Sequence, residues 1–218
     1  MSKNIVITGA TGVVGSVLVD GLANFHDVTP LTRLQCDMTN LELLSQCVPK
    51  DTDCLVHLAW KDSDIYSEGQ FDPDNIVMAL NVLEVAVRYN IKHVVLASSV
   101  HVREYRGHEG VISASDHTMP TSLYGATKVY LEELGKYYAR YHNLQVTAVR
   151  LGGVNRDDSP VGKDEQDYNR IYLSHIDLIT AFNDIVNEPN VPASFSMFYL
   201  VSEGDSTIHH RDKFEIKD

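Results

Sequence analysis

Cysteine is scarce in this chain, and its pattern excludes two kinds of protein. Only Cys36, Cys47 and Cys54 occur among the 218 residues. Their number is odd and no Cys-x-x-Cys spacing is present, so neither a disulfide framework nor a cysteine-built zinc site is expected. The sequence also lacks any Asn-x-Ser/Thr acceptor for N-linked glycans, as is typical of a chain outside the secretory pathway.

Basic residues are few as well. Lys and Arg total 18 against 30 Asp and Glu, which gives a formal net charge of −12. A chain this acidic repels phosphate backbones and anionic lipid, so neither nucleic acid nor a membrane is an expected partner. A small anionic ligand stays compatible with this charge, because a helix N-terminus can hold a phosphate inside an acidic protein.

Long hydrophobic runs are missing too. The segment Ile5–Val19 carries no charge, but glycines and threonines interrupt it, and no stretch is long enough to cross a bilayer. Apolar residues still make up 44% of the chain, which suffices for a full core. We therefore expect a soluble cytoplasmic protein built on one generous domain.

Short β-branched runs alternate with longer amphipathic segments. Strands are predicted at Asn4–Thr8, Asp27–Thr32, Leu34–Cys36, Asp53–Leu58, Val94–Ala97, Val146–Val149 and Phe195–Val201. Helices are predicted at Gly12–Ala23, Leu41–Val48, Pro73–Tyr89, Ser122–Tyr141 and Ser174–Asn187. Pro30 favours an edge position for the second strand. The alternation predicts an α/β fold with a Rossmann-type, doubly wound parallel sheet, in which ligands bind at the carboxyl ends of the strands.

A glycine-rich loop follows the first predicted strand. Thr8 to Gly15 reads T-G-A-T-G-V-V-G, with glycines at 9, 12 and 15. Gly9 suits the tight turn, Gly12 lets backbone N–H groups approach a pyrophosphate, and Gly15 permits close helix–strand packing. The alternative is a glycine-rich turn without a ligand. Because the loop lies between a strand and a helix, we interpret it as a dinucleotide-binding site.

Two further signals lie later in the chain than the glycine loop. Tyr124 and Lys128 are four residues apart on a predicted helix, so they share one face. A lysine ammonium there would lower the pKa of the phenol, ordinarily near ~10, toward a useful general base. Ser99 ends a central strand, where its hydroxyl can stabilise a developing oxyanion. The alternatives are an ordinary surface Tyr/Lys pair and a strand-ending serine turn.

The order of glycine loop, serine and Tyr-x-x-x-Lys resembles the short-chain dehydrogenase/reductase superfamily, in its extended branch of NAD-dependent epimerases and dehydratases. The resemblance implies Tyr124 as general base, Lys128 as its partner and Ser99 as hydroxyl stabiliser, with Ser98 as the fallback. It implies cofactor contacts at Gly9, Thr11, Gly12, Val13, Val14, Asp37, Met38, Leu58, Ala59, Trp60, Asn75, Ala97, Tyr124 and Lys128.

Within that branch the chain resembles uronate dehydrogenases most. Those enzymes oxidise C1 of hexuronic acids, and the resemblance implies substrate contacts from Ser99, Tyr124, His101 and Arg170, the last binding a carboxylate. A solvated arginine and a packed loop histidine are the alternatives. Two departures bear on the substrate. The chain has Val100 where that subgroup has Asn, and Gly153 where it has Ser.

Both NAD and NADP are candidate cofactors at this point. NAD-specific relatives place an acid at the tip of the second strand, and this strand has none after Val28. Arg33 at its end can pair with a 2′-phosphate and favours NADP, whereas the resemblance favours NAD. Arg33 is therefore added to the candidate cofactor contacts.

These observations lead to one expectation. Residues 1–202 form an NAD(P)-binding Rossmann domain, with a small substrate-binding cap mainly from 152–175, and 203–218 form a polar, mobile tail. The chain is expected to be an NAD(P)-dependent oxidoreductase acting on a carbohydrate. A nucleotide-sugar epimerase or dehydratase and a non-catalytic nucleotide sensor are the alternatives. A homodimer is compatible with the resemblance. A metal site is not expected, even at His209-His210 in the tail.

Overall fold

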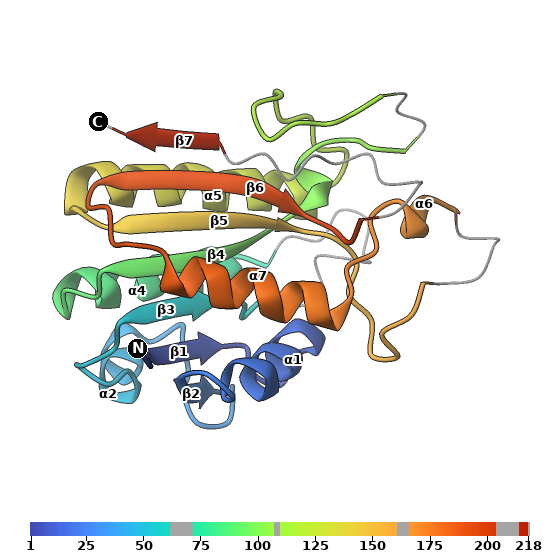
Figure 1. Cartoon of the computed structure of the whole chain (residues 1–218). Helices are drawn as coiled ribbons and strands as arrows, with labels where there is room; N and C mark the ends of the chain where they lie inside the picture. Colours follow the sequence, from blue (N-terminus) through green and yellow to red (C-terminus); the bar gives the residue numbers. More distant parts are fainter. Residues whose placement is uncertain (62–71, 107–109, 161–165, 204–213, 218) are drawn as a thin grey trace.

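The computed structural model describes residues 1–61, 72–106, 110–160, 166–203 and 214–217 of the chain. Its centre is a sheet with the strand order β2-β1-β3-β4-β5-β6-β7 (Figure 1). The strands are β1 (Asn4–Thr8), β2 (Asp27–Leu31), β3 (Cys54–His57), β4 (His93–Ser99), β5 (Gln145–Leu151), β6 (Ser194–Leu200) and β7 (Phe214–Lys217). β1 to β6 pair in parallel, and β7 joins β6 in antiparallel pairing.

Helices cover both faces of the sheet. They are α1 (Val13–Leu22), α2 (Leu41–Cys47), α4 (Asp74–Arg88), α5 (Leu123–His142), α6 (Gln166–Asn169) and α7 (His175–Asn187), with a 3₁₀ turn η1 at Val100–Val102. One apolar cluster joins α2, α4 and α5 to one face, and another joins α1 and α7 to the opposite face (Figure 1). Every residue of β4 and β5 is buried, which explains why these strands read as nearly continuous apolar runs. The predicted Rossmann-type parallel sheet is confirmed.

Side-chain caps define where helices α2, α5 and α7 begin. Asn40 accepts from the backbone N–H groups of Glu42 and Leu43 at the start of α2, and Ser122 accepts from Gly125 N at the start of α5. Ser174 caps α7 in the same way, with Asp177 N donating to Ser174 Oγ over 3.2 Å. Helices α1 and α4 have no side-chain cap, and the N-cap residue of α1 is Gly12.

Two expectations about individual segments need correction. The predicted strand at Leu34–Cys36 is wrong: the N–H groups of Gln35 and Cys36 both donate to Thr32 O, which closes a turn right after β2. The segment 203–218 is more than a polar tail, because its residues 214–217 form β7 against β6. The edge position predicted from Pro30 is confirmed, since β2 has a neighbour only on the β1 side in the described sheet.

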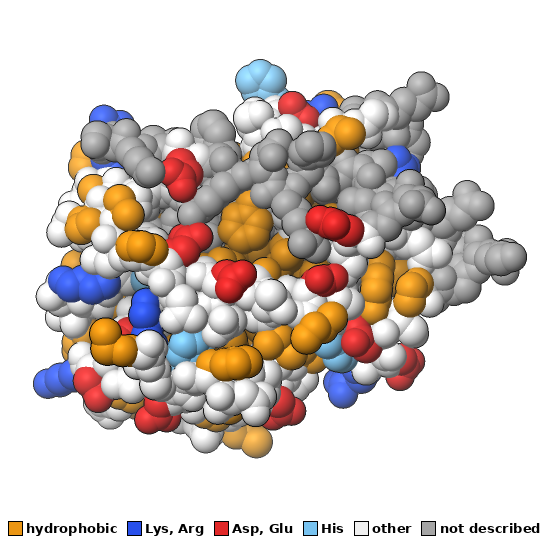
Figure 2. All heavy atoms as spheres, in the orientation of Figure 1, with side chains coloured by type: hydrophobic (Ala, Val, Ile, Leu, Met, Phe, Trp, Pro, Cys, Tyr) orange, Lys and Arg blue, Asp and Glu red, His pale blue; other side chains and the backbone are white. Residues whose placement is uncertain are grey.

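The surface carries its negative charge in a dispersed form. Figure 2 shows aspartate and glutamate side chains spread over this face, and the lysine and arginine side chains on it do not gather into a basic patch. In the described ranges, no helix combines the length and the apolarity that crossing a bilayer requires.

Candidate functional site

The glycine loop after β1 is shaped by two close backbone approaches. Gly9 has φ of +70°, and a Cβ there would lie 2.6 Å from Ala59 N. A Cβ on Gly15 would lie 2.2 Å from Gly9 O. Both positions therefore require glycine, the first for its conformation and both for space. Gly12 differs, because a Cβ there would meet only Gly9 O at 3.3 Å, which leaves open space above the loop.

The open space faces an uncapped helix N-terminus. Gly12 and Thr11 are exposed, no side chain caps α1, and no acidic residue lies in its first turn. The backbone N–H groups of Val13 and Val14 lie in that turn, at the positive end of the helix dipole. These features fit the pyrophosphate of a dinucleotide, because they offer N–H donors and room without a competing anion.

The turn after β2 presents the residues predicted near an adenosine. Asp37 is exposed, and its Oδ1 accepts from the N–H and the hydroxyl of Thr39, the main reason why the pKa of this carboxyl is lowered. Met38 is buried, and its carbonyl accepts from Asn81 Nδ2 at 2.9 Å on α4. Arg33 is exposed. The turn is thus anchored to α2 and α4 and holds one acidic and one basic side chain at the surface.

A buried Thr8–His57 pair connects β1 to the end of β3. Thr8 Oγ1 accepts from the N–H groups of Leu58 and Ala59 and lies 2.9 Å from His57 Nδ1. Since the hydroxyl oxygen already accepts two bonds, its proton points to Nδ1. Nε2 of His57 is buried and meets no hydrogen-bond partner within the described residues. Sequence reasoning missed this pair, which fixes the Leu58–Ala59 backbone against Gly9.

His57 makes stability sensitive to acid. Burial first, and then the charge of Lys128, lowers its pKa from 6.5 to about 3. Between those values the unfolded chain binds a proton that the folded chain does not, so this group makes stability fall as pH falls. We expect His57→Gln to reduce the slope of unfolding free energy against pH, between pH 6.5 and 4.5, by roughly 1 kcal/mol per pH unit. Urea unfolding at each pH measures it. His117→Gln, at an exposed position, is the control, and equal slopes in both variants would contradict the prediction.

The adjacent serines at the end of β4 have different surroundings. Ser98 Oγ donates to the buried Glu132 Oε1 at 2.6 Å, on the α5 side of the sheet. Ser99 is 4% exposed, and its Oγ accepts from His101 N at 3.2 Å at the start of η1. Because consecutive strand residues point to opposite faces and Ser98 is tied to Glu132, Ser99 is the better candidate for contact with a ligand.

Tyr124 and Lys128 meet Trp60 at the carboxyl edge of the sheet. Lys128 is 4% exposed, and its Nζ donates to Ala97 O at 2.8 Å. The same Nζ lies 3.5 Å from the centre of the Trp60 ring and 5.5 Å from the centre of the Tyr124 ring. Trp60 also packs edge-on against Tyr124, with 6.3 Å between ring centroids. The predicted helical spacing thus places both side chains on one face of α5, beside the end of β3.

The loop residues predicted to contact substrate lie next to this group. His101 packs between two tyrosines, 5.8 Å from Tyr124 and 5.7 Å from Tyr105 by ring centroids, and burial lowers its pKa. Arg170, half-buried, donates to Tyr105 O over 3.3 Å. Ser99, His101, Tyr124 and Arg170 are therefore connected through direct contacts or one shared neighbour.

The remaining predicted cofactor residue has a structural contact. Asn75 is fully buried at the start of α4, and its Oδ1 accepts from Lys61 N at 2.8 Å. This bond holds the backbone that follows Trp60. Residues 161–165 of the predicted cap and the His209-His210 pair lie outside the described residues. Elsewhere in the described chain, no group of three or more His, Cys, Asp or Glu side chains is placed to hold a metal ion.

A buried ion pair behind Ser98 was also missed from the sequence. Arg150 Nε and Nη2 donate to the two carboxylate oxygens of Glu132 at 2.8 and 2.9 Å, and both side chains are about 1% exposed. Arg150 Nη1 donates further to Ala114 O and to the Tyr199 hydroxyl. Burial alone lowers the pKa of Arg150, but the bonds and charge of Glu132 outweigh it and raise the pKa. The signal available was a single arginine in an otherwise uncharged strand, with a glutamate on the preceding helix.

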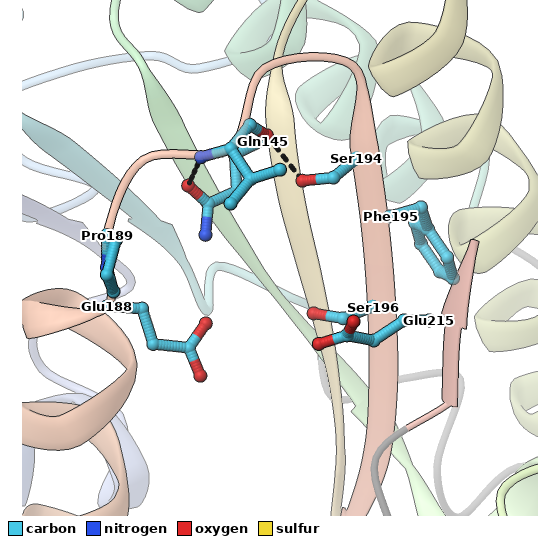
Figure 3. Close-up of a pocket in the computed structure, with 8 residues that line it drawn as sticks. Gln145, Glu188, Pro189, Ser194, Phe195, Ser196 and Glu215 are labelled. Atoms are coloured by element: carbon cyan, nitrogen blue, oxygen red, sulfur yellow. Dashed lines mark hydrogen bonds between the residues drawn. The ribbon is translucent and has the colours of Figure 1, made fainter. Parts of the chain in front are cut away.

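A separate cavity of about 160 Å³ lies at the opposite end of the sheet. It is lined by Gln145, Glu188, Pro189, Val191, Ser194, Phe195, Ser196 and Glu215. Figure 3 shows the carboxylates of Glu188 and Glu215 on opposite sides of it. Gln145 and Ser194 are the first residues of β5 and β6, so the cavity adjoins the amino ends of the strands. It is far from the glycine loop along the strands and includes none of the candidate residues.

Comparisons with known proteins identify the family of this chain. The model of the NAD dependent epimerase/dehydratase family matches residues 5–155. L-arabinose 1-dehydrogenase (NAD(P)(+)) from Haloferax volcanii is 33% identical over 168 residues, and uronate dehydrogenase from Pseudomonas putida is 24% identical over 164 residues. The alignments cover 68% and 69% of this chain, but only 66% and 60% of those two enzymes.

A solved structure shows the same fold over nearly the whole chain. The crystal structure of glucuronic acid dehydrogenase from Chromohalobacter salexigens superposes with a TM-score of 0.79 at 22% identity, over 97% of this chain and 81% of that one. At that identity the likeness establishes the fold alone.

Proposed function

Because the chain belongs to the NAD dependent epimerase/dehydratase family, we propose that it is a nicotinamide-dependent dehydrogenase that oxidises a sugar or sugar acid. The observation that carries the proposal is the meeting of Tyr124, Lys128 and Trp60 beside the uncapped glycine loop. A non-catalytic sensor would need the loop but not this group. The sugar dehydrogenases among the relatives support the substrate class.

Each protein group has a task in this proposal. Tyr124 removes the proton from the substrate hydroxyl, and the Lys128 ammonium stabilises the charge left on the phenol oxygen. The Ser99 hydroxyl donates a hydrogen bond to the reacting substrate oxygen. The Ala97 carbonyl keeps Lys128 in place through the 2.8 Å bond. When bound, the nicotinamide supplies the hydride acceptor.

The residues around the glycine loop and the β2 turn would hold the cofactor. The loop N–H groups of Val13 and Val14 would face the pyrophosphate, and Asp37 and Met38 would border the adenosine. Arg33 is the group that would select for a 2′-phosphate. The family is NAD-dependent by its description, whereas Arg33 favours NADP. Both NAD⁺ and NADP⁺ therefore belong in the assay.

Trp60 provides a direct test of cofactor binding. It is the single tryptophan of the chain, and its Nε1 is buried without an acceptor among the described residues. We expect NAD⁺ or NADP⁺ to quench its fluorescence saturably, because a nicotinamide riboside held by Lys128 must contact the indole. In Gly12→Val the Cβ makes one tight contact, at 3.3 Å from Gly9 O, and the rest of the side chain fills the pyrophosphate space. The apparent Kd should rise at least about tenfold there. Equal titrations of the two proteins would contradict the cofactor site.

The substrate class is tested by reduced-nicotinamide absorbance over a panel of aldoses and uronic acids, with each cofactor. An increase in the absorbance of reduced nicotinamide that depends on one class of sugar supports the proposal. A flat trace with a tightly held cofactor, and a change of sugar configuration instead, would replace it with the epimerase alternative. A flat absorbance trace with neither a tightly held cofactor nor a change of sugar configuration would favour the non-catalytic sensor.

Arg170 separates sugar acids from neutral sugars. If it binds a carboxylate, Arg170→Ala should raise KM for uronic acids about ten- to a hundredfold, because a charge-assisted bond is lost. KM for neutral aldoses should stay within about twofold. Steady-state kinetics on both classes measure the difference. Equal losses on both would assign Arg170 to supporting Tyr105 rather than to the substrate.

The exposed tyrosines of α5 bear on the proposed homodimer. Tyr130, Tyr137 and Tyr141 are each about half exposed or more, and Val77 of α4 is exposed as well. Apolar surface of this kind is suited to a subunit interface. Sedimentation analysis tests the proposal directly, and a monomer at micromolar concentration would remove it.

A further inference from the structure

Two of the three cysteines meet beside the β2 turn. Cys36 lies in that turn and is 3% exposed. Cys47 is the last residue of α2, packs against the same apolar cluster, and its Sγ lies 3.8 Å from the carbonyl oxygen of Gln35, the neighbour of Cys36. The two thiols lie within hydrogen-bonding reach of each other. Cys54 lies in β3 and is equally buried, at 1% exposure, but makes no such contact in the described structure.

The two thiols differ in how much of each is exposed to solvent. Burial, reinforced by the hydrogen bond with Cys47, raises the pKa of Cys36 to about 12, so Cys36 must lose its proton in the same step in which its sulfur attacks. Cys47 is half-buried at the end of a helix. An oxidant in solution therefore reaches Cys47 first, and Cys36 is already positioned to react with the product.

We propose that Cys36 and Cys47 form a reversible disulfide under peroxide, and that this bond alters cofactor binding. In the first step the Cys47 sulfur attacks one oxygen of hydrogen peroxide, which gives a sulfenic acid and one water. In the second step the Cys36 sulfur attacks the sulfenic sulfur, the S–S bond forms, and the hydroxyl leaves with the Cys36 proton as a second water. Two thiols are oxidised by two electrons and one peroxide is reduced.

The bond would change the shape of the β2 turn. An S–S bond of about 2.0 Å is much shorter than a contact between thiols, so Cys36 and the end of α2 must approach each other. Asp37 follows Cys36 directly, and Met38 is fastened to α4 through Asn81. Pulling one end of this segment while the other is fixed displaces the Asp37 carboxylate. The effect on cofactor binding rests on the proposed function, because Asp37 and Met38 border the adenosine only in that proposal.

The test uses the full chain and hydrogen peroxide at a small molar excess. Intact mass should fall by about 2 Da, and peptide mapping should join Cys36 to Cys47 within one chain. Dithiothreitol should reverse both changes. Cys36→Ser and Cys47→Ser should each abolish the cross-link, and Cys54→Ser should retain it. A cross-link to Cys54, a link between chains, or uptake of oxygen without a cross-link would overturn the proposal.

The kinetic arm separates the two proposals. In an active preparation, oxidation should raise KM for the nicotinamide cofactor at least about threefold and leave kcat within about twofold. The Cys47→Ser variant should be insensitive to peroxide. Unchanged KM in a fully cross-linked sample would overturn the coupling to the cofactor. If the reduced enzyme oxidises no sugar, the proposed function fails, but the mass measurement still decides the disulfide.

Discussion

Phenylalanine in place of Tyr124 is expected to leave a folded protein that binds its cofactor but turns over sugar about 10²–10⁴-fold more slowly. The substitution removes one oxygen and keeps the ring. The edge contacts of that ring with Trp60 and His101, at 6.3 and 5.8 Å between centroids, are therefore preserved. Only the group that would take the substrate proton is lost. The measurement is kcat with the best substrate of the panel, together with a Trp60 titration by cofactor.

Tyr130 offers a matched control on the same helix. It is 47% exposed and lies two residues after Lys128 on α5. Residues two apart do not share a face of a helix, so Tyr130 lies on a different face from Lys128. Tyr130→Phe should keep kcat within about twofold of the parent. If Tyr124→Phe retained a similar kcat, Tyr124 would not be the base. If Tyr124→Phe lost cofactor binding as well, the tyrosine would instead support the cofactor site.

The sequence predicted which residues meet in the candidate site because its signals are local. A glycine loop, a strand-ending serine and a Tyr-x-x-x-Lys pair each depend on a few neighbouring residues. In a parallel sheet the carboxyl ends of the strands share one edge, so the order of the signals was enough to bring Gly12, Ser99 and Tyr124 to that edge. Even Pro30 indicated the edge position of β2, since a proline removes a ladder donor.

Two segments have a conformation that their composition did not predict. Leu34–Cys36 has strand-like composition, but the two N–H groups that would bond a neighbouring strand donate to Thr32 O instead. Residues 214–217 have no apolar run long enough to predict a strand. They form a strand because they pair with the edge of β6. The first segment is thus decided by a local turn that outweighs its strand-like composition, and the second by a strand far from it in the sequence.

Trp60 shows the same limit within the site. Its place after the β3 strand suggested a cofactor contact, but the ring also covers Lys128 at 3.5 Å. That contact depends on how α5 lies over the ends of β3 and β4. The spacing of Tyr124 and Lys128 determines only that they share a face of the helix, not which aromatic ring lies above the ammonium.

The buried ion pair depends on registry across two strands and a helix, and its removal should have the largest effect on stability. Arg150 on β5 reaches Glu132 on α5, and Ser98 on β4 donates to the same carboxylate. Glu132→Gln keeps the volume but leaves the Arg150 charge buried and unpaired. We expect a loss of about 3–5 kcal/mol in the free energy of unfolding. Against a total of roughly 5–15 kcal/mol, that is a large fraction.

The adjacent residue gives the control for this loss. Glu133 pairs with Lys136 at the surface, and its side chain is 62% exposed. Glu133→Gln should therefore change the unfolding free energy by less than about 1 kcal/mol. Urea unfolding of both variants measures the difference. The double variant Glu132→Gln/Arg150→Met should recover part of the loss, because it removes the unpaired charge as well. Equal stabilities of Glu132→Gln and Glu133→Gln would mean that Arg150 is balanced by Tyr199 and the Ala114 carbonyl without its carboxylate partner.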